Sequence, residues 1–261
     1  MFGVSKPVIG MVHLKPLPGS PNFGGRFRDV LRFAVEDAEA LVSGGVDGLL
    51  VENYWDTPYS VYVGPETVAA MSVIAARIVE EFGVPVGVNV LRNDAVAALA
   101  VASASGAKFI RVNVFGGVYV SMEGLLLGNA RKILEYRGRL GLDDVQIWAD
   151  LRVKHAWPLT DIALTDEAKD LYERCNVDAL VMTGRRTGLP PNPQDLQNVR
   201  QAVPDAKIII GSGLTLSNVQ NLLSLADGAI VGTYFKRDGK IRNKVDANRV
   251  RRFMELVSTL R

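Results

Sequence analysis

The side chains best suited to proton transfer stand where short apolar runs of the chain end. Glu52 and Asp150 each close such a run, His13 closes an earlier one, and Lys154 follows Asp150 by four residues. A carboxylate serves as a general acid or base when its surroundings tune its pKa, and Lys154 or Arg111 could do this here. Histidine exchanges protons near neutral pH. We therefore predict Glu52, Asp150, His13 and Lys154 as the catalytic candidates.

Amide, guanidinium and hydroxyl side chains occupy equivalent positions on the other runs and are candidates for orienting a substrate. They are Asn53, Asn89, Arg92, Arg111, Asn113, His155, Thr183 and Arg185. A single polar residue of this kind is often a structural ion pair or a capped loop. Polar groups at one level on six runs must satisfy one another or bind a ligand, because an unpaired buried charge is costly. The repetition favours a pocket.

Several other chemistries receive little or no support. A histidine-rich metal site is disfavoured, because the chain has only two histidines and Lys15 stands two residues after His13. No cofactor is certain, although Glu52 and Asp150 could together hold Mg²⁺. The chain lacks a G-x-S-x-G turn, and its one cysteine is expected to be a packing residue. A Schiff base on Lys154 is a minor alternative.

Two glycine-rich turns near the end of the chain are candidates for binding phosphate. One is Gly211-Ser212-Gly213, before a helix expected to open at Thr215, and the other is Gly232-Thr233. Glycine lets backbone amides approach phosphate oxygens, and a helix N-terminus favours an anion. Lys236 or Arg237 could add positive charge.

An aromatic-rich segment, Tyr54–Tyr62, follows the run that ends at Glu52. It could be a lid that stacks on a base or sugar. Packing of the loop or a subunit contact would explain it equally well.

The elements that must position these residues alternate between short apolar runs and longer amphipathic stretches. Such alternation predicts an α/β fold with a parallel sheet and crossover helices. Strands are expected near 8–13, 46–52, 85–91, 108–114, 145–151, 178–183, 207–211 and 228–232. Helices are expected near 28–43, 65–83, 94–105, 123–140, 165–175, 193–203, 215–224 and 246–260, with Asp94, Thr165 and Thr215 as caps.

Eight such units predict a single (β/α)8 TIM barrel spanning residues 1–261, with its site where the strands end. The alternative is an open doubly wound sheet, but no G-x-G-x-x-G turn follows the first run. Many barrels form closed assemblies, so a homo-oligomer is expected.

Composition limits the partners of the protein. The formal net charge of +2 gives no field for nucleic acid, so we expect a small phosphorylated molecule as partner. No run is long enough to span a bilayer, and the start of the chain does not resemble a signal peptide. A single cysteine fits a reducing, cytoplasmic location. Peripheral membrane association stays open.

The motifs of this chain resemble those of the BtpA family over nearly its whole length. They are Ile9–Leu14 with Pro16–Pro21, Val51–Asn53, Gly64–Val68, Pro85–Asp94, Phe109–Asn113, Val153–Ala156, Thr183–Gly188, Gly211–Gly213 and Gly228–Thr233. One departure concerns the segment after the fourth strand, where an Asp-Gln-Gly stretch is expected and the chain reads Met122-Glu123-Gly124. A carboxylate role there depends on Glu123.

The resemblance implies a barrel and two kinds of function. Members are linked to photosystem I biogenesis at thylakoid membranes, and one relative is grouped with sugar-metabolism genes and suspected of nucleosidase activity. We therefore expect an enzyme, a lyase, isomerase or nucleosidase, acting on a phosphorylated sugar or nucleoside-like compound. The alternatives are an assembly factor for a membrane complex and a regulator that binds a phosphometabolite without turnover.

Overall fold

The computed structural model describes residues 1–261 and has a closed barrel of eight parallel strands at its centre. The order around the barrel is β1-β2-β3-β4-β7-β9-β10-β11. These strands are β1 (Val8–His13), β2 (Gly48–Glu52), β3 (Val86–Asn89), β4 (Phe109–Val112), β7 (Gln146–Leu151), β9 (Ala179–Met182), β10 (Ile208–Ile210) and β11 (Gly228–Val231). All eight fall within the expected runs, and the predicted TIM barrel is confirmed.

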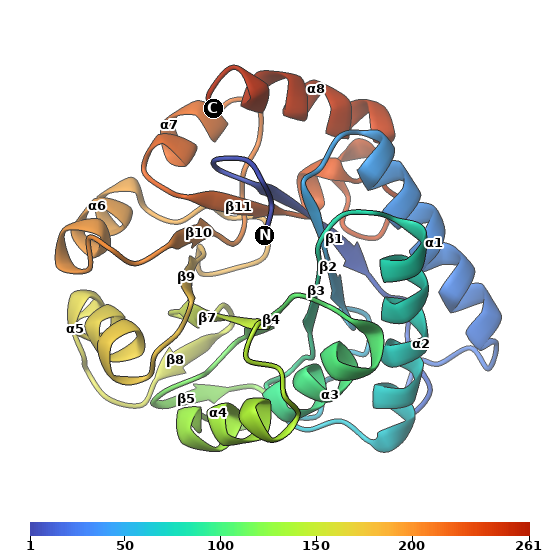
Figure 1. Cartoon of the computed structure of the whole chain (residues 1–261), viewed down its shortest axis with the longest axis horizontal. Coiled ribbons are helices and arrows are strands. Elements are labelled where there is room, and N and C mark those ends of the chain that lie inside the picture. The colour runs from blue at the N-terminus through green and yellow to red at the C-terminus, as the bar shows by residue number, and fades with distance from the viewer.

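The helices follow one another around the outside of the strands (Figure 1). They are α1 (Phe27–Ser43), α2 (Pro65–Glu81), α3 (Ala95–Ser105), α4 (Ala130–Arg139), α5 (Leu164–Lys169), α6 (Pro193–Ala202), α7 (Val219–Ser224) and α8 (Ala247–Ser258). A π-helical turn, Asp170–Arg174, extends α5, and short 3-10 turns cover Thr233–Phe235 and Arg237–Gly239. None of the helices combines the length and apolar character that a membrane crossing requires.

The interior of the barrel is apolar at one end and polar at the other. Nine buried side chains, among them Met11, Leu50, Phe109 and Trp148, form a separate cluster inside the barrel. Side chains alternate along a strand, so the residues two positions further on also point inward. On β1, β2, β4 and β7 these are His13, Glu52, Arg111 and Asp150. The same alternation that fills the barrel therefore places polar groups at its carboxyl end.

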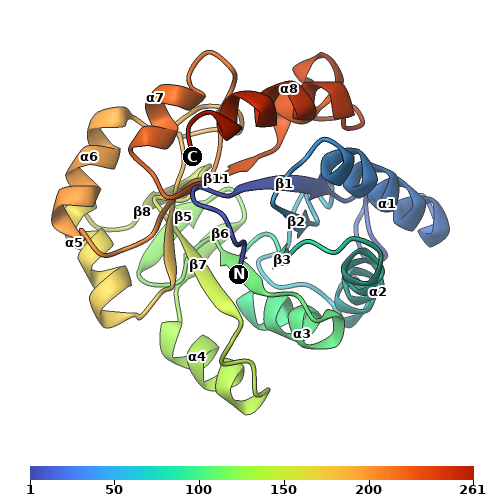
Figure 2. The same cartoon turned by 45° about the horizontal axis from the view of Figure 1, so that its top comes forward.

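The segment after β4 differs from the expectation. A helix was predicted near 123–140, but the chain forms a hairpin of β5 (Val118–Ser121) and β6 (Gly124–Leu127) before α4 begins at Ala130. With β8 (Ala156–Pro158), the hairpin makes a three-stranded antiparallel sheet of order β6-β5-β8, beside the barrel (Figure 2). Gly124, at φ +104°, allows the tight turn. Asn129 then caps α4 by accepting from the Lys132 amide.

Two of the three predicted caps are wrong. Asp94 caps α3 as expected, because its carboxylate accepts a hydrogen bond from the Ala97 amide at 2.9 Å. However, α5 follows Ala163 without a side-chain cap, and α7 begins only after Asn218. Asn218 instead bonds back to the amide of Thr215 and the carbonyl of Gly213, which holds the turn after β10 in a non-helical form.

Candidate functional site

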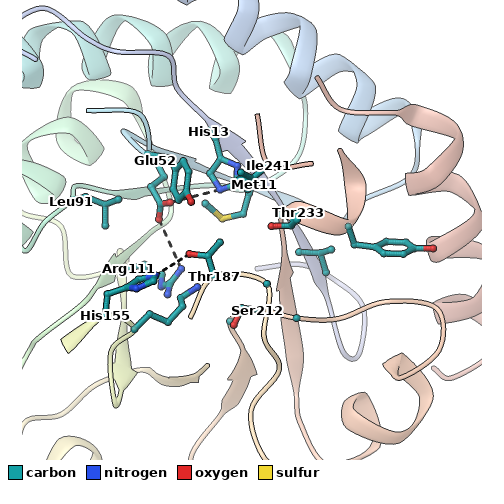
Figure 3. Close-up of a pocket in the computed structure, with 18 of the residues that line it drawn as sticks. Met11, His13, Glu52, Leu91, Arg111, His155, Thr187, Ser212, Thr233 and Ile241 are labelled. Carbon is teal, nitrogen blue, oxygen red and sulfur yellow. Dashed lines mark hydrogen bonds and ion pairs between the residues drawn. The ribbon is translucent and has the colours of Figure 1, made fainter. Parts of the chain in front are cut away.

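A cavity of about 420 Å³ opens at the carboxyl ends of the strands (Figure 3). Its wall includes residues at the ends of β1, β2, β4 and β11 and Arg249 of α8. The rest of the wall comes from the loops that follow β2, β3, β4, β5, β7, β9, β10 and β11. The polar residues in the wall include His13, Glu52, Tyr54, Tyr59, Arg92, Arg111, Asn113, Glu123, Lys154, His155, Thr187, Ser212, Thr233 and Arg249.

Strand register sets the polar level of the site. His13 lies beside Glu52 on the neighbouring strand, Glu52 beside Asn89, and Asn89 beside Arg111. Adjacent residues of parallel strands project to the same face of a sheet, so these four side chains enter the barrel at one height. The sequence pattern had suggested this level from the ends of the apolar runs alone.

Glu52 is the carboxylate that faces the cavity. Its side chain is 7% exposed. The two nearest basic side chains are His13, whose Nε2 lies 3.8 Å from Oε1, and Arg111, whose Nη1 lies 4.0 Å from Oε2. Both separations exceed hydrogen-bond length. Burial raises the pKa of Glu52, and the positive charge of Arg111 only partly opposes this. Figure 3 shows Glu52 between His13 and Arg111. Such a carboxyl keeps its proton to a higher pH than an exposed glutamate does, and so can give or take a proton.

Asp150 is placed differently and does not line the cavity. Its Oδ1 accepts from Arg111 Nε at 2.8 Å, and its Oδ2 accepts from Arg111 Nη2 and Asn113 Nδ2, both at 3.0 Å. Burial alone would lower the pKa of Arg111, but the Asp150 carboxylate outweighs it and raises that pKa. Arg111 therefore stays charged. Asp150 orients Arg111 and Asn113, which do line the cavity.

His13 is a neutral imidazole in these surroundings. Burial, followed by the charges of Lys236 and Lys154, holds its pKa well below the ordinary value. The ring packs against Tyr54, with centroids 4.6 Å apart, and its Nδ1 atom is buried without a hydrogen-bond partner. A neutral histidine beside a carboxyl of raised pKa forms a pair through which a proton can pass.

Lys154, Arg92 and Glu123 form the side of the cavity nearest the small sheet. Burial lowers the pKa of Lys154 to about 8, with Arg111 contributing by repulsion. Arg92 donates to the Lys154 carbonyl and lies 3.4 Å from Glu123 Oε2. Glu123 sits in the turn between β5 and β6, so this chain does bring a carboxylate to the cavity at the Met122-Glu123-Gly124 departure.

The opposite wall consists largely of backbone. Gly211, Ser212, Gly213, Gly232 and Thr233 all line it. The amides of Ser212, Gly213 and Gly232 donate to no acceptor within the chain, which leaves them free for a ligand. The Ser212 hydroxyl is already engaged, since it donates to the Leu189 carbonyl at 2.8 Å. Because α7 is short and begins four residues after Thr215, these loop amides, and not a helix N-terminus, would hold an anion.

The positive charge beside this wall comes from a residue that the sequence did not single out. Arg249, near the start of α8, lines the cavity, and its Nε donates to the Tyr234 carbonyl at 2.7 Å. The suggestion that Lys236 or Arg237 would serve is wrong. Lys236 is buried in an ion pair with Asp37 at 2.6 Å, and Arg237 is exposed outside the cavity. Arg249 belongs to no local sequence motif. It reaches the cavity only because closure of the barrel brings the start of α8 to the carboxyl ends of the strands.

The aromatic segment after β2 contributes two of its four rings to the cavity. Tyr54 and Tyr59 line it, and the Tyr59 hydroxyl donates to the Tyr54 carbonyl at 2.6 Å. Trp55 instead packs beneath Arg242, and Tyr62 is 60% exposed. From the β9 side, Thr187 approaches His155 Nε2 at 3.3 Å. The loop after β2 therefore contributes aromatic side chains to the cavity, and the loop after β9 contributes a polar one.

Four of the residues predicted to bind substrate lie outside the cavity wall. Asn53 anchors its loop by bonding to Asp56 and to the Leu91 backbone. Asn89 donates to the Arg111 carbonyl and to Asn113 Oδ1. Thr183 has a buried hydroxyl without a partner, and Arg185 is exposed. Arg92, Arg111, Asn113 and His155 do line the cavity.

Comparison with known proteins places this chain in a family. The model of the BtpA family matches residues 4–259. The chain belongs to the BtpA family. It is 45% identical to the photosystem I biogenesis protein BtpA of Synechocystis over 98% of this chain and 90% of the relative. It is also 43% identical to an uncharacterised protein of Thermococcus kodakarensis, over 98% and 97% of the two chains.

Solved structures confirm the barrel at lower sequence identity. The N-(5'-phosphoribosyl)anthranilate isomerase of Pyrococcus furiosus superposes with a TM-score of 0.59, covering 97% of this chain and 99% of the other at 14% identity. At that identity the likeness concerns the fold alone. The BtpA family member described here thus shares the architecture of a barrel enzyme, with its own set of cavity residues.

Proposed function

We propose that the protein is an enzyme acting on a small phosphorylated sugar or nucleoside-like substrate, with acid–base chemistry at Glu52. The observation that carries this is the division of the cavity. One wall holds a buried carboxyl of raised pKa that has no hydrogen bond to the protein, and the other offers free backbone amides and Arg249. Such a cavity can hold a phosphate at one end and a reacting carbon or oxygen at the other.

Each polar residue has a distinct task in this proposal. Glu52 takes a proton from the substrate or gives one to it, and neutral His13 passes it on or receives it. Arg111, held by Asp150, stabilises negative charge that develops on a substrate oxygen. Lys154, with a pKa of about 8, can supply a second proton. An acid and a base of this kind can serve a lyase, an isomerase or a nucleosidase, and a partner for negative charge serves those reactions that pass through an enolate.

A magnesium ion would need a different ligand set from the pair suggested by sequence. Both oxygens of Asp150 accept hydrogen bonds from Arg111 and Asn113, so of that pair only Glu52 could join the substrate phosphate as an oxygen donor. Mg²⁺ commonly binds in this way, through one or two carboxylates and the phosphates of a substrate. The ligand-binding experiment below is therefore done with and without Mg²⁺.

A second candidate function rests on the 45% identity to a photosystem I biogenesis protein. The protein could assist assembly of a membrane complex and use the cavity to sense a phosphometabolite without turning it over. Binding without any product would favour this candidate.

Thermal melting against phosphosugars, nucleotides and inorganic phosphate, with and without Mg²⁺, tests the proposal. A ligand at 100 times its Kd adds about 2.7 kcal/mol, which shifts the melting temperature by roughly 2–4 °C in a domain of this size. Compounds that shift it are then incubated with the wild type and with Glu52→Gln, and products are followed by mass spectrometry. Product from the wild type but not from the variant supports the enzyme. The absence of a shift across the panel contradicts the phosphate site.

A further inference from the structure

The small sheet beside the cavity presents an apolar face to solvent. Half of the twelve large hydrophobic residues exposed anywhere on the chain belong to this sheet and its immediate ends. They are Val120 at 41%, Met122 at 92%, Leu125 at 54%, Leu127 at 50%, Trp157 at 64% and Leu159 at 59% exposure. Their concentration in one small element separates them from scattered surface residues, which need no explanation.

Strand register shows that five of these side chains share one face. Val120 is paired with Leu125 on one side and with Trp157 on the other. Leu127 pairs with Val118, and the Leu159 amide donates to the Val118 carbonyl at 2.9 Å. Cross-strand neighbours point to the same side of a sheet. We call this outer surface, together with Met122 at the hairpin turn, the sheet face.

The other side of the same sheet is already packed. Tyr119 and Leu126 are buried there and form a cluster with Val114 and Val153. The Tyr119 hydroxyl also donates to Glu167, which accepts from Arg152. The inner side therefore fixes the sheet rigidly to the barrel, and the sheet face needs no rearrangement to receive a partner.

The size and charge of the sheet face fit a second copy of this chain. A large apolar side chain presents roughly 150–250 Å² when free, so the six exposed fractions amount to on the order of 600 Å². A standard interface buries about 800 Å² on each partner, and homodimer interfaces are about 65% apolar. The three strands carry no charged residue. An uncharged flat surface is self-complementary, whereas an anionic membrane would favour basic side chains around it.

We propose that two copies of the protein associate through their sheet faces, stacked across a two-fold axis. Stacked sheets pack about 10 Å apart, which lets Trp157 of each copy cover Val120 and Leu125 of the other. Each turn that carries Glu123 into a cavity would then be held by the dimer. The inference extends beyond the proposed enzymatic function and does not depend on it.

Sedimentation equilibrium of the full chain tests the dimer. The wild type is expected at twice the chain mass of 28.3 kDa at micromolar concentration. Trp157→Ser should raise the dimer Kd by about 30-fold or more, because tryptophan is enriched among the residues that dominate the binding energy of interfaces. Leu125→Ser should raise it by a smaller factor. Val73→Ser, on α2 and 50% exposed, is the matched control and should leave the Kd unchanged. Circular dichroism confirms that all variants fold.

Three results would overturn the proposal. The first is a wild type that stays monomeric at tens of micromolar, and the second is a dimer that both sheet-face variants leave intact. The third is a monomer that co-sediments with phosphatidylcholine–phosphatidylglycerol vesicles and loses this binding in Trp157→Ser. That result would assign the sheet face to a lipid surface in place of a second copy.

Discussion

The two walls of the cavity are built from different materials. The wall from β1 to β4 presents side chains whose charges interact, with Arg111 between Glu52 and Asp150. The wall from β10 and β11 presents glycine-rich backbone whose amides lack acceptors. Side-chain groups can change protonation, whereas backbone amides provide a fixed field for an anion. In the proposed function, the first wall would therefore do the chemistry and the second would hold the substrate.

A similar contrast separates Glu52, in the first wall, from Asp150 on β7, which does not line the cavity. Asp150 accepts three hydrogen bonds, so its charge is satisfied and structural. Glu52 accepts no hydrogen bond from the protein, and burial raises its pKa. Its ionised form is therefore unfavourable, and its carboxyl group is free to contact a ligand. Position at the end of a strand is therefore not sufficient for reactivity. The number of hydrogen-bond donors that neighbouring strands place beside each carboxylate separates the structural one from the one that can react.

The largest expected effects come from exchanging each carboxylate for its amide. Glu52→Gln should lower turnover by about 10²- to 10⁴-fold, as expected for the loss of a general acid or base. Its stability should be unchanged or higher at pH 7, because a pKa raised in the folded state makes ionisation of Glu52 unfavourable to folding as pH rises through that pKa. Denaturant unfolding at pH 5 and pH 7 measures this.

Asp150→Asn is the matched opposite and should lower the free energy of unfolding by about 3 kcal/mol, because it leaves Arg111 buried without its bidentate partner. The same denaturant titration measures it. If Asp150→Asn were as stable as the wild type while Glu52→Gln unfolded easily, the division between a structural and a reactive carboxylate would be reversed.

A smaller effect is expected at the other wall. Arg249→Met should weaken binding of a phosphorylated ligand by about 10- to 100-fold, the range for losing one charge-assisted hydrogen bond. Arg252→Met, an exposed position on the same helix, is the control and should bind normally. Calorimetry with the ligand found by melting gives both affinities. Equal affinities in the two variants would remove Arg249 from the phosphate site.

Replacing Gly213 is a poorer test of this wall. Gly213 has a φ of +77°, and a Cβ there would lie 2.1 Å from the Pro190 nitrogen. Any larger residue would displace the loop after β9 as well as the turn itself, so lost binding would not identify the phosphate contact.

The smallest expected effect is a pH dependence from Lys154. With its pKa near 8, Lys154 is charged at pH 7 and loses its proton as pH rises through 8. Affinity for a dianionic sugar phosphate should be nearly level below pH 7, fall about two-fold by pH 8 and fall several-fold by pH 9. Lys154→Met should bind more weakly at pH 7 and lose this slope. A slope that persists in the variant would place the titrating group elsewhere.

Much of the fold could be predicted because local pattern and tertiary structure agree on it. The eight strands fall within their expected runs, since both faces of a parallel strand are buried and the sequence must be apolar throughout. The hairpin at β5 and β6 was missed because Leu125, Leu126 and Leu127 follow one another without the alternation of a typical exposed sheet. The three leucines differ in burial only after folding, when Leu126 packs on the inner side of the sheet and Leu125 and Leu127 stay exposed.

The sequence by itself determined the barrel, the polar level at the strand ends, the two glycine-rich turns and membership of the BtpA family. These depend on residue types and spacings of a few positions, which a chain carries with it. The tertiary structure alone decided that Glu52 faces the cavity while Asp150 is taken up by Arg111, and that Lys236 is paired with Asp37 while Arg249 reaches the glycine wall. These outcomes depend on which distant side chains meet, because the free energy of a buried charge is set by its neighbours in space.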